Sequence, residues 1–127
     1  MTRPLPSHPL EKPIRWVASS KKDLLSFPEE VRAEIGYALS YAQLGERSDN
    51  ARTLQGFRGA SVIEIIEDHQ NDTYRAVYTV RFAGVIYVLH CFQKKSHRGI
   101  ATDPQDIALI RQRLAAAEEL HQAASQE

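Results

Sequence analysis

The chain has 127 residues, and 16 Lys and Arg side chains are balanced by 16 Asp and Glu side chains, so its formal net charge is zero. This length suits one domain with a core, and 43% hydrophobic with 25% charged residues is typical of globular proteins. A single cysteine excludes an internal disulfide and a cysteine-rich zinc site, and no apolar run approaches the roughly 20 residues of a membrane helix. We therefore expect a soluble, cytoplasmic protein.

The first half of the chain predicts an arm, a strand and two helices. Residues 1–12 are rich in proline, which favours an extended backbone, so we expect a flexible arm there. Residues 14–18 contain Trp16 and Val17 and predict a short strand. A helical hairpin should follow: Pro28 suits the first turn of its second helix, and apolar residues then recur every three or four positions as far as Gly45.

The second half of the chain predicts strands and one more helix. From residue 56 to residue 92 the apolar period is 2, and the runs 62–67, 74–82 and 85–92 predict three antiparallel strands. Asp103 and Pro104 then suit the cap and first residue of a last helix. The expected fold class is α+β in the order β-α-α-β-β-β-α, with an antiparallel or mixed sheet of about four strands and the helices on one face. A single domain should span residues 13–122, followed by a tail at 123–127.

The last two predicted strands place their charges on one face. If Ala83 and Gly84 form a two-residue turn, Arg75 lies opposite Phe92 and Val77 opposite His90. Because side chains alternate, Arg75, Arg81 and His90 then share one face, and the other face is almost wholly apolar. Burying an unpaired guanidinium is costly, so we expect the charged face to be open and the apolar face to lie under the helices.

A cluster of basic residues leaves the end of the second strand of this hairpin. It consists of Lys94, Lys95, His97 and Arg98. A solvated loop is the alternative interpretation of such a run. Charge is unevenly distributed along the chain, since residues 52–100 carry seven cationic and four anionic side chains and residues 101–127 carry two and five. Zero net charge therefore does not exclude a nucleic-acid partner, because the positive excess is local.

The stretches Tyr74–Tyr78 and Tyr87–Lys95 resemble the phage-derived HigB-like toxins of the RelE/ParE superfamily of type II toxin–antitoxin systems. The resemblance extends over most of the chain apart from the proline-rich arm. It implies a RelE-like fold and a metal-independent endoribonuclease that cleaves mRNA on the ribosome, inhibits translation and arrests growth. It also implies no cofactor, and a helix-turn-helix antitoxin of the HigA type as partner. Family members often carry Arg at the position of Ile66, so one phosphate contact is missing here.

Metal-free RNA cleavage needs the 2′-hydroxyl to attack the adjacent phosphate, and cations held at that phosphate stabilise the transition state. Arg75, Lys94 and Lys95 are the candidates for this role, and His90 is the candidate for proton transfer. The expected substrate contacts are Arg58, Arg81, His97 and Arg98.

Other interpretations of these residues are weaker. Gly56 and Gly59 have the spacing of an RNA backbone clamp, but that loop should join two helices and this one leads into a strand. We predict no metal site, because His90 and Cys91 are adjacent on a strand and point to opposite faces. The rival functions are a non-nucleolytic ParE-like toxin that binds a protein such as DNA gyrase, and a degenerate member that only binds partners. The neutral charge and Ile66 favour these rivals slightly.

Overall fold

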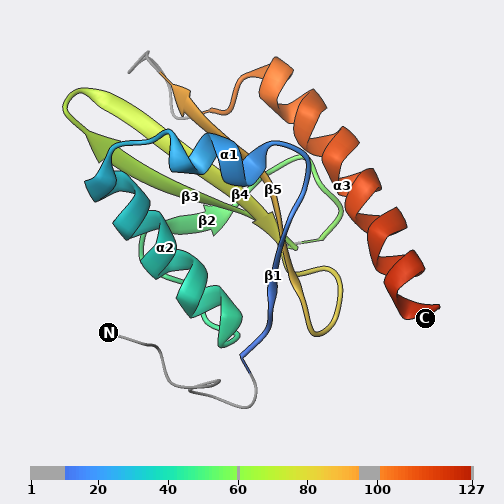
Figure 1. Cartoon of the computed structure of the whole chain (residues 1–127). Helices are drawn as coiled ribbons and strands as arrows, with labels where there is room; N and C mark the ends of the chain where they lie inside the picture. The colour runs from blue at the N-terminus through green and yellow to red at the C-terminus, as the bar shows by residue number, and fades with distance from the viewer. Residues whose placement is uncertain (1–10, 60, 95–100, 127) are drawn as a thin grey trace.

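The computed structural model describes residues 11–59, 61–94 and 101–126 (Figure 1). Most of the proline-rich arm therefore lies outside the described residues. The elements in chain order are β1 (Ile14–Trp16), α1 (Ser20–Leu25), α2 (Glu29–Gln43), β2 (Ala51–Thr53), β3 (Val62–His69), β4 (Asp72–Thr79), β5 (Ile86–Lys94) and α3 (Pro104–Ser125). The predicted order is confirmed apart from one addition, the short strand β2. Helix α3 continues through most of the residues that we expected to form a tail.

The five strands form one mixed sheet in the order β1-β5-β4-β3-β2. Strand β1 pairs with β5 in parallel, and every other neighbouring pair is antiparallel. The parallel pair arises because the hairpin of α1 and α2 carries the chain away from β1 before the meander begins. The α+β class is thus confirmed, with one strand more than expected.

Helices cover both faces of the sheet, so the expectation that all helices share one face is wrong. Helices α1 and α2 pack on the first face, where the apolar stripe of α2 meets β3 and β4; its members are Val31, Ile35, Ala38, Leu39 and Ala42. Helix α3 packs on the second face, where Ile110 and Leu114 meet Val77 and Leu89 (Figure 1). The central strands carry apolar side chains on both faces, and both faces therefore need a cover.

The register of β4 and β5 is as predicted at one end of the hairpin and shifted at the other. Arg75 pairs with Phe92 and Val77 with His90, but a β-bulge follows, so that Tyr78 pairs with Val88. Strand β4 ends at Thr79, and residues 80–85 form a longer connection than the two-residue turn we expected. The extra residue of β5 exchanges the faces beyond the bulge.

The bulge accounts for the residues whose faces were predicted wrongly. Ile86 and Val88 were expected on the charged face, but they pack under α1 and α2. Tyr87 and Leu89 were expected on the apolar face together with Tyr74 and Ala76, but they lie on the opposite face, against α3. The charged end of the hairpin lies before the bulge, so the placement of Arg75 and His90 on one face is confirmed.

Candidate functional site

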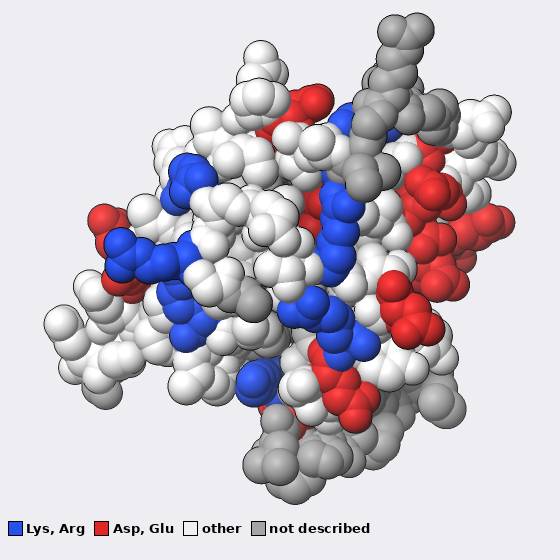
Figure 2. Space-filling model, turned by 180° about the vertical axis from the view of Figure 1, so that it is seen from behind, with Lys and Arg blue, Asp and Glu red and all other residues white. Residues whose placement is uncertain are grey.

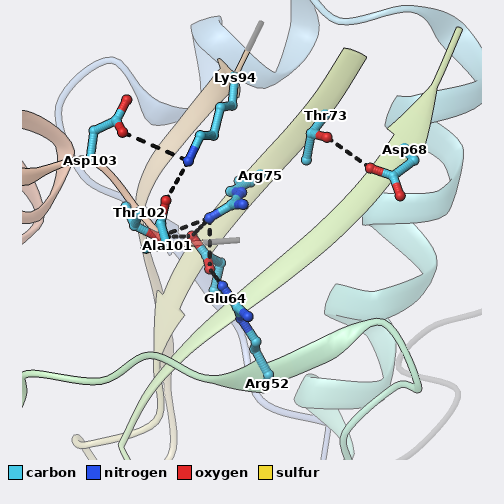
Figure 3. Close-up of polar contacts among 9 residues, drawn as sticks. All are labelled: Arg52, Glu64, Asp68, Thr73, Arg75, Lys94, Ala101, Thr102 and Asp103. Carbon is cyan, nitrogen blue, oxygen red and sulfur yellow. Dashed lines mark hydrogen bonds and ion pairs between the residues drawn. The ribbon is translucent and has the colours of Figure 1, made fainter. Parts of the chain in front are cut away.

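Three of the predicted catalytic residues meet at one end of the α3-facing side of the sheet. Arg75 comes from β4, and His90 and Lys94 come from β5 at alternate positions around Phe92, which is the register partner of Arg75. Figure 3 shows Arg75 and Lys94 projecting from neighbouring strands toward residues 101–103. We call Arg75, His90 and Lys94 the cationic cluster. Lys95, His97 and Arg98 lie outside the described residues.

Arg75 is not on an open face, as the sequence suggested, but is 3% exposed. Its Nη1 lies 3.4 Å from both carboxylate oxygens of Glu64, which is fully buried on β3. Nη1 also donates to the Thr102 hydroxyl at 3.0 Å, and that hydroxyl donates to Glu64 at 2.7 Å (Figure 3). Burial is costly for an unpaired guanidinium, whereas this one is paired with a carboxylate and is therefore tolerated.

One buried N–H donor of Arg75 has no acceptor among the described residues. Its Nε is buried and forms no hydrogen bond within the described part of the chain. Buried polar groups are nearly always satisfied, so an unpaired N–H at such a position calls for an explanation. A bound oxyanion would supply the missing acceptor, because guanidinium groups bind phosphate oxygens with two parallel N–H donors. Ile66 lies directly opposite Arg75 in the β3–β4 register, so it adds no charge there.

His90 is held by polar contacts with two side chains of α3 and by stacking on an aromatic ring. Its Nε2 lies 2.8 Å from Asp106 Oδ1, and its Nδ1 lies 3.4 Å from Arg113 Nη1. Arginine can only donate, so Nδ1 accepts and the Nε2–H donates to Asp106. The imidazole stacks on Phe92 with ring centroids 4.5 Å apart. His90 therefore holds an imidazole whose Nε2–H points at Asp106, and it must take up a proton at Nδ1 before it can give one.

Lys94 is also neutralised by the segment that precedes α3. It is 8% exposed; Nζ donates to the carbonyl oxygen of Ala101 and lies 3.7 Å from Asp103 Oδ1. Residues 101–106 thus supply a partner to every member of the cationic cluster. The sequence reasoning missed Glu64, Thr102 and Asp106. A signal did exist for Glu64, since it is the single acid within the apolar run of residues 62–66.

Arg58 and Arg81 do not join the cationic cluster. They line a separate cavity of about 600 Å³ together with Phe57, Arg111 and Glu118. A neighbouring cavity of about 590 Å³ lies closer to the cluster and is lined by Arg52, Thr102 and Ile107, among others. Arg52 donates to Glu64 at 3.1 Å, so this second cavity adjoins the buried ion pair of Arg75 (Figure 3).

Neither metal ligands nor a nucleophilic cysteine emerge around these residues. Within residues 11–59, 61–94 and 101–126, no group of three or more His, Cys, Asp and Glu side chains could hold a metal ion. Burial raises the pKa of the Cys91 thiol from 9.0 to about 12, so the thiol stays protonated at neutral pH. Cys91 packs in the core beneath α1 and α2 as a small apolar residue.

Comparison with known proteins identifies the family. A family model described as phage derived protein Gp49-like (DUF891) matches residues 22–115. The chain belongs to this Gp49-like family. The region that the Gp49-like model matches contains the whole cationic cluster and its partners Glu64, Thr102 and Asp106, but not β1 or the end of α3.

Two further comparisons complete the description of this Gp49-like protein. Among solved structures, a chain of the toxin–antitoxin complex RelBE2 from Mycobacterium tuberculosis is similar, with 14% sequence identity and a TM-score of 0.43. The similarity covers 70% of this chain and 98% of that chain. No curated protein matches the sequence. None of the helices in the described part of the Gp49-like chain is both long enough and apolar enough to cross a membrane.

Proposed function

We propose that this Gp49-like protein is the toxin of a type II toxin–antitoxin system, of the HigB-like RelE/ParE kind, and that it cleaves mRNA on the ribosome without a metal ion or cofactor. The resemblance of the β4 and β5 sequences to HigB-like toxins supports this class of activity. The observation that carries the chemistry is the cationic cluster itself. Two cations and a histidine lie at one end of the sheet, and the buried Nε of Arg75 lacks an acceptor among the residues that the structure describes.

The proposed reaction is an in-line displacement at phosphorus. The 2′-hydroxyl loses its proton to water and attacks the adjacent phosphorus, the bond from phosphorus to the 5′-oxygen breaks, and a 2′,3′-cyclic phosphate and a 5′-hydroxyl result. Arg75 and Lys94 hold the phosphate oxygens as negative charge builds up on them. His90 takes up a proton from water at Nδ1 in place of its contact with Arg113, and the resulting imidazolium donates its Nε2 proton to the departing 5′-oxygen. Lys95, His97 and Arg98 are proposed to add charge around the same phosphate.

Substrate must compete with residues 101–103 for these cations. The Thr102 hydroxyl and the Ala101 carbonyl occupy Arg75 and Lys94, and a phosphate would replace both as an acceptor. Oxygens that carry charge form stronger hydrogen bonds with guanidinium and ammonium groups than neutral oxygens do, which favours this exchange. The proposed partners are mRNA, the ribosome and a HigA-like helix-turn-helix antitoxin, with the cytoplasm as the place of action.

A second candidate function is supported by the burial of the same residues. Arg75 is paired with Glu64 and Lys94 with Asp103, so both cations are already neutralised. If these ion pairs only stabilise the fold, the protein is instead a non-nucleolytic toxin that binds a target such as DNA gyrase, or a family member that only binds partners.

Induced expression separates the two functions. We expect growth arrest with new 5′-hydroxyl ends in translated messages, and a cleavage rate about 100-fold lower for Arg75→Lys, which keeps the charge but loses the planar fork. The control is Arg15→Gln, since Arg15 is exposed on β1 and pairs with Tyr87, near the end of β5 opposite to Lys94. Growth arrest with intact messages and inhibited supercoiling would refute the nuclease and support the gyrase-binding function.

A further inference from the structure

A second group of basic side chains lies beside α3 and is not used by the proposed chemistry. Arg58 comes from the loop after β2, Arg81 from the connection after β4, and Arg111 from α3, and all three are exposed around the cavity of about 600 Å³. Among the described residues that line that cavity, Glu118 is the one acid. We call this cavity the arginine groove.

Arg111 is held in place before any ligand arrives. Its Nη2 donates to the Gly56 carbonyl at 2.6 Å, and its guanidinium lies over the Phe57 ring at 4.6 Å from the ring centroid. Gly56 has a φ of +95°, a conformation that favours glycine and turns the loop toward α3. A fixed guanidinium loses less conformational entropy on binding than a free side chain does, so the groove is partly preorganised.

The arginine groove and the cavity beside the cationic cluster have neighbouring linings. The two cavities are lined by consecutive stretches of the chain, residues 52–55 at the end of β2 and residues 56–58 after it, and by successive turns of α3 at Ile107 and Arg111. Eleven residues of α3 separate Ile107 from Glu118, which corresponds to about 16 Å at 1.5 Å per residue. About five stacked nucleotides span that length at 3.4 Å each.

We propose that the arginine groove binds the backbone phosphates of single-stranded RNA, on one side of the bond that is cut at the cationic cluster. This inference rests on the proposed RNA substrate. Three arginines against one carboxylate favour a polyanion, and the neighbouring cavity that is lined by Thr102 favours a ligand that also reaches Arg75. Figure 2 shows the side of the molecule away from α1 and α2, where Lys and Arg side chains lie over the middle and left and Asp and Glu gather mainly at the right.

The test measures binding of an eight-nucleotide RNA, labelled with fluorescein and 2′-O-methylated so that it cannot be cleaved. The variant Arg58→Gln/Arg81→Gln loses two cations. Each phosphate contact with single-stranded RNA contributes about 0.7 to the slope of log affinity against log salt. We therefore expect the slope to decrease by about 1.4 and the affinity at about 0.1 M salt to fall about 25-fold. Circular dichroism should show an unchanged fold, because Arg58 and Arg81 are exposed.

A neighbouring pair of glutamates on α3 supplies a matched control. Glu118 lines the groove, whereas Glu119 does not, and both are exposed. Glu118→Gln should tighten RNA binding about fivefold, while Glu119→Gln should change it by less than about twofold, and misfolding cannot produce the gain. Equal effects of the two substitutions would indicate bulk charge alone and would overturn the proposal.

The remaining outcomes distinguish this inference from the proposed function. Unchanged RNA affinity of the Arg58→Gln/Arg81→Gln variant would overturn the proposed RNA binding by the groove. This holds whatever the protein cleaves, because the 2′-O-methylated RNA cannot be cleaved. An eight-residue poly-glutamate that displaces the RNA at equal concentration would also overturn it, since it would identify an acidic protein segment as the ligand. If Arg75→Lys leaves cleavage intact while the groove variant loses RNA binding, the proposed chemistry is wrong and the groove stands.

Discussion

The buried carboxylate of Glu64 should be the most sensitive polar group in the described sheet. It is fully buried and accepts hydrogen bonds from Arg52, Arg75 and Thr102. Glu64→Gln keeps the shape of the side chain but leaves the guanidinium of Arg75 buried without an opposite charge. Removing one member of a buried ion pair typically costs about 3–5 kcal/mol in free energy of unfolding. We expect that loss here.

Urea unfolding followed by circular dichroism measures this loss. With an m-value of about 2 kcal/mol per molar urea, the unfolding midpoint should fall by about 1.5–2.5 M. Glu67→Gln is the matched control on the same strand. Desolvation by burial raises the pKa of Glu67, so its ionised form slightly opposes folding at neutral pH. That substitution should therefore give no loss or a small gain. A loss below about 1 kcal/mol for Glu64→Gln would refute the importance of the ion pair.

Three further predictions concern the surroundings of the cationic cluster. Thr102→Val removes the hydroxyl shared by both members of the buried ion pair and should cost about 1–3 kcal/mol in thermal or urea unfolding; no loss would mean that the shared hydrogen bonds are unimportant. Asp106→Ala removes the acceptor of the histidine and should cost about 1–2 kcal/mol, whereas Gln105→Ala on the exposed side of α3 should cost almost nothing. The raised pKa of Cys91 predicts slow alkylation of the folded protein at pH 8, measured by mass spectrometry, and fast labelling would show an accessible thiol. The protonated thiol should also contribute to the free energy of unfolding in full below about pH 9, and this contribution should decline as the pH rises toward about 12.

The fold was predictable wherever a local pattern decides the structure. The apolar stripe of α2 and the turn at Gly45, which has a φ of +81°, were both read from spacing and residue type. The β-bulge after Val77 was not predictable, because alternation is equally regular on either side of an inserted residue. The position of α3 was also not predictable. Apolar residues on both faces of β4 and β5 show that each face of the sheet is covered, but they do not show which helix covers it.

Strand alternation predicted the positions of two candidate residues but not their partners. The pairing of Arg75 with Phe92 followed from it and placed Arg75 and His90 on one face, whereas Arg81, expected on the same face, lies in the connection after β4. The partners Thr102 and Asp106 come from a segment that reaches the sheet only through tertiary packing, and no spacing rule connects them with β4. The cationic side chains therefore indicated a candidate place for an anion. Long-range contacts determine how much of their positive charge is already paired within the protein.

The lengths of the outer strands have a consequence for association. Both strands at the margins of the sheet, β1 and β2, contain three residues, whereas the long apolar strands β4 and β5 lie inside. The two short strands do not cover the whole of their neighbours, because β1 pairs only with residues 86–88 of β5 and β2 only with residues 63–65 of β3. Within the described part of the chain, residues 89–94 of β5 have no strand on the side of β1, so this edge carries a longer row of backbone groups than β1 itself does. A partner that added a strand should therefore gain more hydrogen bonds beside β5 than at β1 or β2.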